Sequence, residues 1–146
     1  MAASVVDSET ALKIARRAKR VAVLGIKPES KAGQPAYEVP SFLADTGVQV
    51  IPVPVYFPEL TSVLGQKVYR KLIDIPGGPV DVVDVFRRPQ DLPQHTEDII
   101  AAKPRVVWLQ TGISNSEVEG QLVAAGIDVV VDRCLMVDRR TALSRY

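Results

Sequence analysis

The sequence predicts a three-layer α/β fold, in which a five-stranded, mainly parallel sheet carries helices on both faces. Short apolar runs rich in valine alternate with longer amphipathic segments along the 146 residues. This alternation is typical of parallel strands joined by helical crossovers. The hydrophobic content of 47% and charged content of 24% are ordinary for a globular chain. The length predicts a single domain over residues 1–146.

The helices are expected in the following places. The N-terminal segment 1–19 holds a helix that Ser8 can cap, and a second helix over 36–46 has Pro40 near its first turn. Further helices are predicted at 89–103 and at 114–126, the last capped by Ser114 or Asn115 and closed by Gly126. The tail 133–146 shows no clear periodicity and receives no assignment.

The strands are predicted at 21–26, 48–55, 80–86, 105–110 and 127–132. Pro52 and Pro54 indicate that pairing in the second strand ends there. Residues 56–79 are typical of a loop with one helical turn near 70–73.

Composition argues against several classes of partner. A net charge of +1 disfavours a general nucleic-acid or membrane-surface role. There is one cysteine, so no internal disulfide forms and a reducing cytoplasm is expected. An apolar run of about 18 residues, the minimum for a membrane span, does not occur, and residues 1–10 lack the layout of a secretion signal.

Basic side chains follow several of the predicted strands. In a parallel sheet, ligands bind beyond the carboxyl ends of the strands, where the strand order reverses. The cations expected at that edge are Lys27, Lys31, Arg87, Arg88 and Arg133. A basic edge beside a helix N-terminus is suited to phosphate groups.

The loop after the first strand is unlike a dinucleotide-binding loop. It carries one glycine, Gly25, where the G-x-G-x-x-G pattern has three. The second strand ends in "IPVPVYFPE", and its nearest acid that could read a ribose is Glu59. A plain turn glycine at Gly25, and ion pairs of Arg87 and Arg88 with Asp84 or Asp91, remain the alternative interpretation of these residues.

Several blocks together resemble the stand-alone CoA-binding domain family, which is related to the CoA-binding domain of the succinyl-CoA synthetase α subunit. The blocks are "VAVLG", "VIPVP", "LGQKVYRKLIDIP", "VDVVDVFRRPQDLP", "VVWLQTGISNSE" and "VVVDRCLMVDRR". They run from about Val21 to Arg140. The resemblance implies a Rossmann-like fold that binds coenzyme A, or an acyl-CoA, at the carboxyl edge of the sheet.

The resemblance also implies which residues hold the ligand. The loop from Gly25 to Lys31 would bind phosphates, and side chains beside the nucleotide would come from the end of the third strand. Lys27, Ser30 and Lys31 suit the phosphates of CoA. The complete set of expected contacts is Gly25, Ile26, Lys27, Ser30, Lys31, Val53, Pro54 (adenosine side), Phe86, Arg87, Arg88, Gln110 and Gly112 (pantetheine side).

The chain departs from the family pattern at three places. Pro35 and Ala36 stand before Tyr37 where a serine is common, the second strand lacks the asparagine of a V-N-P ending, and the segment "VYFPEL" is inserted after it. This insert is expected to reshape the adenine pocket.

Three functions remain open. The first is a CoA-binding module with no chemistry of its own. The second is the CoA-binding subunit of a two-chain acyl-CoA synthetase, and the third is an NAD(P)-binding redox sensor. The single histidine, His95, is interpreted as a surface helix residue, as are Glu97 and Asp98, and no metal site is expected.

Two further expectations concern the end of the chain. Cys134 is interpreted as a buried apolar residue, with a mixed disulfide to the CoA thiol as the alternative hypothesis. A homodimer is plausible, because the first helix and the tail carry apolar residues with no assigned partner.

Overall fold

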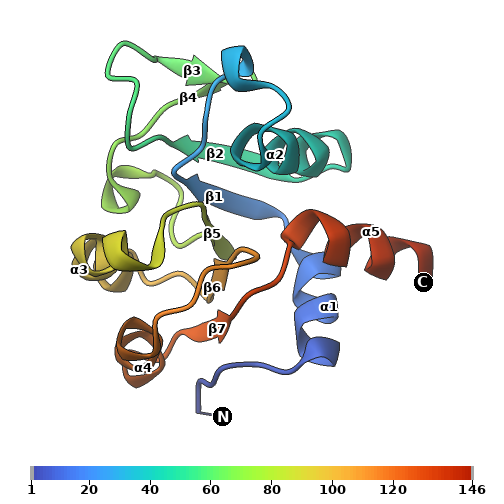
Figure 1. Cartoon of the computed structure of the whole chain (residues 1–146), viewed down its shortest axis with the longest axis vertical. Coiled ribbons are helices and arrows are strands. Elements are labelled where there is room, and N and C mark those ends of the chain that lie inside the picture. Colours follow the sequence, from blue (N-terminus) through green and yellow to red (C-terminus); the bar gives the residue numbers. More distant parts are fainter. Residues whose placement is uncertain (1, 146) are drawn as a thin grey trace.

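The computed structural model describes residues 2–145 as three layers around a five-stranded sheet (Figure 1). All neighbouring strands in this sheet are parallel, in the order β2-β1-β5-β6-β7. The strands are β1 (Arg20–Leu24), β2 (Gln49–Val53), β5 (Val82–Val85), β6 (Val106–Leu109) and β7 (Asp128–Val130). The predicted α/β, Rossmann-like fold class is therefore confirmed.

Five helices cover the two faces of the sheet. Figure 1 shows α1, α2 and α5 on one side and α3 and α4 on the other. Their bounds are α1 (Ser8–Arg17), α2 (Pro35–Asp45), α3 (Pro93–Ala102), α4 (Ser116–Ala124) and α5 (Leu135–Arg145). Two apolar clusters result, because alternate strand residues point to opposite faces. In β5, Val82 belongs to the first cluster, whereas Val83 and Val85 belong to the second.

Of the predicted helix N-caps, that of α4 is confirmed and that of α1 is not. Asn115 caps α4, since its Oδ1 accepts a hydrogen bond from the Val118 N–H at 3.1 Å. The prediction for α1 is wrong by one residue: Asp7 is the cap, and its Oδ1 accepts from the Thr10 N–H at 2.9 Å. Both residue types make good caps, so the sequence alone does not choose between neighbours.

Pro40 lies inside α2, well past the first turn in which it was predicted, because the helix begins at Pro35. A proline has no N–H to give to the carbonyl four residues earlier. That carbonyl, Ala36 O, instead accepts a hydrogen bond from Lys27 N–H at 3.1 Å. The proline thus frees a backbone acceptor that anchors the loop after β1.

Pro52 and Pro54 mark the end of β2, as predicted. Pro52 lies within the strand, paired in register with Val23, and pairing ends at Val53, before Pro54. β2 is an edge strand, where a proline is tolerated. On the outer side, Pro52 O accepts a hydrogen bond from Tyr69 N–H at 2.9 Å. At the opposite edge of the sheet, Val5 forms a parallel bridge with Val129 of β7.

Two elements were not predicted. A small antiparallel hairpin, β3 (Ser62–Val63) and β4 (Gln66–Lys67), stands in the segment expected to be a loop, which also contains the short 3₁₀ turn Leu72–Asp74. The unassigned tail forms α5, which packs against α1. Ala11 and Ala15 of α1 and Leu135 and Ala142 of α5 are buried, whereas Val137 and Leu143 of α5 remain exposed. The homodimer therefore stays a prediction.

Candidate functional site

Three strand ends meet at the carboxyl edge of the sheet. Gly25 N–H donates to Val53 O at 2.9 Å, and Phe86 N–H donates to Leu24 O at 2.9 Å. These two bonds join the ends of β2, β1 and β5. The strand order reverses between β1 and β5, so this is the point at which ligands bind in open parallel sheets.

Gly25 is required for this junction. Its φ is +86°, and a Cβ placed there would lie 2.4 Å from Phe86 O and 3.3 Å from Arg87 Cδ. A side chain is excluded both by the backbone conformation and by the space. The interpretation of Gly25 as a plain turn glycine is therefore incomplete, because the residue also lets two neighbouring loops approach closely.

The loop after β1 carries predicted phosphate ligands at different depths. Lys27 is half-buried, and its Nζ donates to Gln34 Oε1 at 2.6 Å. Ser30 and Lys31 are exposed in the 3₁₀ turn Glu29–Lys31, which precedes α2. The loop thus presents one positioned ammonium at Lys27 and an exposed hydroxyl and cation at Ser30 and Lys31.

A cavity of about 220 Å³ opens between these segments. It is lined by three short runs of chain, which are Gly25, Ile26 and Lys27 after β1, Val55, Tyr56 and Phe57 after β2, and Phe86, Arg87 and Arg88 after β5. The insert after β2 was expected to reshape a pocket here, and its aromatic residues do line the cavity. The combination of cations and aromatic rings suits a planar, anionic ligand.

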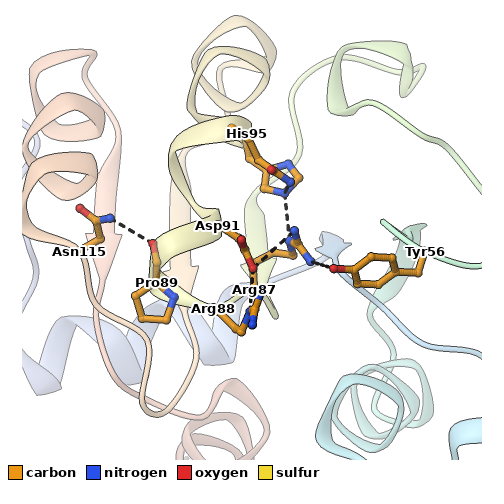
Figure 2. A network of polar contacts seen from close by, with 8 residues as sticks. Tyr56, Arg87, Arg88, Pro89, Asp91, His95 and Asn115 are labelled. Atoms are coloured by element: carbon orange, nitrogen blue, oxygen red, sulfur yellow. Dashed lines mark hydrogen bonds and ion pairs between the residues drawn. The ribbon is translucent and has the colours of Figure 1, made fainter.

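Arg87 is the most constrained cation of this cavity (Figure 2). Its Nε–H donates to His95 Nε2 at 3.1 Å, and its Nη1–H donates to Tyr56 Oη at 3.3 Å. The guanidinium carbon also lies 5.3 Å from the centre of the Tyr56 ring, a cation–π distance. The Arg87 side chain is only 8% exposed.

Asp91 neutralises part of this charge. Its Oδ2 accepts from Arg88 Nε–H at 2.8 Å and lies 3.8 Å from Arg87 Nη2. The bond from Arg88 is the main reason that the pKa of Asp91 falls below its usual value. The ion pair expected for the two arginines is present with Asp91 rather than with Asp84.

His95 is not the isolated surface residue that was predicted. It is half-buried, and burial followed by the charge of Arg87 lowers its pKa. A neutral imidazole with its proton on Nδ1 can accept from Arg87 at Nε2. Asp98 differs from expectation as well, because its carboxylate accepts from Leu72 N–H at 2.8 Å and Ile73 N–H at 3.2 Å.

Comparison with known proteins identifies the family of this chain. A family model described as a CoA-binding domain matches residues 19–140. The chain belongs to the CoA-binding domain family. The resemblance read from the sequence blocks is therefore confirmed.

Relatives of this CoA-binding domain span nearly the same length. The uncharacterized protein YneT of Bacillus subtilis (strain 168) is 34% identical over 125 residues, covering 86% of this chain and 88% of its own. A solved structure from Thermus thermophilus, cell-free ID.343, is 37% identical with a TM-score of 0.82, covering 94% of this chain and 99% of its own.

A larger protein shares the fold. The dinucleotide-forming acetyl-coenzyme A synthetase 1 of Ca. Korarchaeum cryptofilum, solved with phosphate and ADP, is 20% identical with a TM-score of 0.66. The likeness covers 81% of this CoA-binding domain and 26% of the synthetase chain. At this identity the likeness concerns the fold alone.

Four other predicted contacts of this CoA-binding domain do not line the cavity. Val53 and Pro54 are buried and are not among the residues that line the cavity. Gln110 is buried, and its Oε1 accepts from Leu135 N–H at 3.0 Å at the start of α5. Gly112 is exposed, with φ +83°, and its N–H donates to Asp132 Oδ1 at 2.6 Å.

Arg133 differs from expectation, whereas Cys134 lies close to the apolar role that was predicted for it. Arg133 donates from Nε to Asp138 Oδ2 at 2.6 Å, and this bond raises its pKa, so its charge is already paired. Cys134 is a half-buried free thiol that packs against the core beside α5.

Within residues 2–145, no helix has the length and apolar character to span a bilayer. No group of three His, Cys, Asp or Glu side chains in that range could hold a metal ion.

Proposed function

We propose that the domain binds coenzyme A, or an acyl-CoA, with the nucleotide end at the cavity between β1 and β5. The observation that carries this is the close approach of Gly25 to Phe86 at the reversal point of the sheet, with Lys27, Arg87 and Arg88 around one cavity. The cavity of about 220 Å³ is far too small for the whole of CoA. It therefore receives one part of the ligand, and the remainder lies across the exposed edge.

Each part of the nucleotide has a suitable neighbour. Tyr56 is 60% exposed, so its ring can stack on the adenine. Arg88, Lys31 and Ser30 are exposed and can bind the 3′-phosphate or the pyrophosphate. Gln110 and Gly112 follow β6 at the same edge of the sheet and fit the pantetheine arm. Gln110 acts there through its backbone, because its side chain holds α5.

NAD(P) is the weaker ligand candidate. Its adenosine ribose is usually read by an acidic side chain at the end of the second strand. Here β2 ends at Val53 and is followed by Pro54 and Val55, and Glu59 stands in the exposed loop beyond. This edge offers apolar contacts where a ribose diol needs a carboxylate.

The role is proposed to be binding without chemistry. The only histidine of the chain, His95, accepts a hydrogen bond from Arg87 and is held beside it. A synthetase role would then require a catalytic group from a second polypeptide. Co-purification of the domain with such a subunit, dependent on CoA, would favour that alternative.

Calorimetric titration of the full chain tests the ligand. CoA and acetyl-CoA are expected to bind, dephospho-CoA to bind more weakly, and NAD not to bind under the same conditions. Binding of NAD with no binding of CoA would overturn the proposal. Equal binding of CoA and dephospho-CoA would remove the 3′-phosphate from the assigned contacts.

A further inference from the structure

A second and larger cavity lies at the opposite edge of the sheet. Its volume is about 800 Å³. Its lining includes Lys19 just before β1, Gly47 just before β2, Val82 at the start of β5, and Arg105 and Val106 at the start of β6. All of these positions stand at the amino ends of the strands, so the cavity is separated from the candidate CoA site by the length of the sheet.

The charge of this cavity is strongly one-sided. Six cations line it, which are Lys13, Arg16, Arg17, Lys19, Arg105 and Arg139. One carboxylate, Asp81, lines it with them, and its Oδ2 already accepts from the N–H groups of Lys19 at 2.8 Å and Arg20 at 3.0 Å. The whole chain has a net charge of only +1. The excess of positive charge is therefore local to this cavity.

Three of the lining cations, Arg17, Lys19 and Arg105, form no described ion pair. The ion pairs described within residues 2–145 are Arg87–Asp91, Arg88–Asp91 and Arg133–Asp138. The side chains of Arg17, Lys19 and Arg105 take part in none of these. Arg17 and Arg105 are exposed and come from different parts of the fold, α1 and the start of β6, yet both line the same hollow.

Arg139 is the buried member of this group of cations and is only 6% exposed. Its donors bond to neutral oxygens: Ala15 O at 2.9 Å and Arg16 O at 3.2 Å at the end of α1, and Thr46 O at 2.8 Å and Thr46 Oγ1 at 2.7 Å at the end of α2. Burial, and then the charge of Arg16, lower its pKa. A buried guanidinium with neutral partners leaves a positive potential that an anion would lower.

The same bonds remove an obstacle to anions. The carbonyl ends of helices carry partial negative charge and normally repel anionic ligands. At this cavity, Arg139 binds two carbonyls near the end of α1, Ala15 O and Arg16 O, and the carbonyl of Thr46 at the end of α2. The apolar side chains of Ile14, Val82 and Val106 also belong to the lining. The cavity thus combines a cationic rim with an apolar surface, and its volume is typical of small-molecule sites.

We propose that this cavity is a second ligand site, which binds a small molecule carrying several phosphate charges. Arginine forks from separate elements suit phosphate oxygens, which they bind in pairs of hydrogen bonds. The concave shape favours a compact anion over a nucleic-acid duplex, which needs an extended basic surface. This site is independent of the proposed CoA site.

Titration of the full chain with inorganic tripolyphosphate, at about 150 mM salt to screen weak surface attraction, tests the proposal. The test variant is Arg17→Gln/Arg105→Gln, and the control is Lys71→Gln/Lys103→Gln, which removes the same charge from exposed positions elsewhere. Wild type and control are expected to bind alike, with affinity lowered about tenfold or more in the test variant. Equal affinity in all three proteins, or an equal loss in both variants, would overturn the proposal.

Two further titrations distinguish a separate small-molecule site from a shared CoA site and from a nucleic-acid surface. Saturating CoA is expected to leave the tripolyphosphate isotherm unchanged, whereas competition would show that the two ligands share one site and contradict the second-site inference. A 12-base-pair duplex, about the length of one helical turn, is expected to bind more weakly than tripolyphosphate. Tighter duplex binding that is lost in the test variant would replace the small-molecule site by a nucleic-acid surface. Circular dichroism melting curves verify that each variant is folded.

Discussion

Arg87 donates its Nε–H to Nε2 of His95 at 3.1 Å, so a cation and the only histidine of the chain are held together beside the candidate site. The contact requires a neutral imidazole. The charged groups around His95 are Arg87 and Asp91 on its ligand side, and Arg70, Lys71, Glu97 and Asp98 around the neighbouring surface hollow. Burial and Arg87 outweigh the nearby carboxylates, and the pKa of His95 is lowered.

This contact predicts a loss of stability in mild acid. The unfolded chain takes up a proton on His95 near its ordinary pKa of about 6.5, and the folded chain does so only at lower pH. The free energy of unfolding therefore decreases as the pH falls through 6.5, and the decrease stops once the lowered folded pKa is passed. In urea unfolding at a series of pH values, His95→Gln, which keeps an acceptor for Arg87, is expected to lack this component. An identical pH profile in the variant would contradict the assignment.

Arg87 is predicted to be necessary both for ligand binding and for the order of Tyr56. Arg87→Ala leaves His95 and Tyr56 without their partner and is expected to lower stability by about 1–3 kcal/mol. If the proposed function is correct, it also weakens CoA binding by about tenfold or more. Arg87→Lys is expected not to restore binding, because an ammonium cannot reach both partners in one plane. Arg140→Ala, which removes a cation that lies over the Phe42 ring, is the control in the same calorimetric titration.

Gly25→Ala is predicted to be strongly destabilising, by about 2–5 kcal/mol from positive φ and overpacking together. Two other glycines separate these causes. Gly33 has φ +97° with open space around it, so Gly33→Ala measures the free-energy cost of the positive φ alone. Gly120 lies within α4 in open space, and Gly120→Ala is expected to stabilise by up to about 1 kcal/mol. A Gly25→Ala variant no less stable than Gly33→Ala in thermal melting would rule out the clash with Phe86 O.

Asp84 is predicted to make the protein less stable as pH rises. Its carboxyl group is fully buried in β5 and has no hydrogen-bond partner among residues 2–145, and burial raises its pKa well above the usual value. Above the ordinary pKa of about 4 the unfolded chain releases this proton while the folded chain retains it, so the free energy of unfolding falls with pH.

Denaturant titrations between acid and neutral pH measure this effect. Asp84→Asn should abolish the dependence, and Asp84→Val should stabilise the neutral-pH protein by about 1–3 kcal/mol, because no unpaired polar group remains. A wild-type slope that persists in Asp84→Asn would assign the dependence to other carboxylates.

The sequence predicted the sheet well because its signals are local. The valine-rich runs at 80–86 and 105–110 contain β5 and β6, with boundaries shifted by a few residues. Helix α5 was missed because its inward face carries Asp138 and Arg139 beside Leu135 and Ala142, which hides the apolar stripe. The β3–β4 hairpin was missed because Leu64, with φ +53°, occupies a turn position that usually carries Asn or Gly.

Predictions for the candidate site also succeeded where the signal is local and failed where it depends on tertiary packing. Gly25, Arg87 and Arg88 follow strands directly, so the topology brings them to one cavity. The role of His95 depends on how α3 packs beside β5, and no spacing in the sequence reports that contact. Gln110 stands after a strand as expected, yet its side chain holds the start of α5, because a buried amide must satisfy its own hydrogen bonds.

The two edges of the sheet bear on how copies of this protein meet. On the outer side of β2, Pro52 offers no N–H, and its carbonyl is already taken by Tyr69. On the outer side of β7, the backbone of Val129 is engaged by Ser4 and Val6. A further strand from another molecule therefore finds few free backbone groups at either margin. Strand addition at either margin of the five-stranded sheet is therefore disfavoured at Pro52 and at Val129.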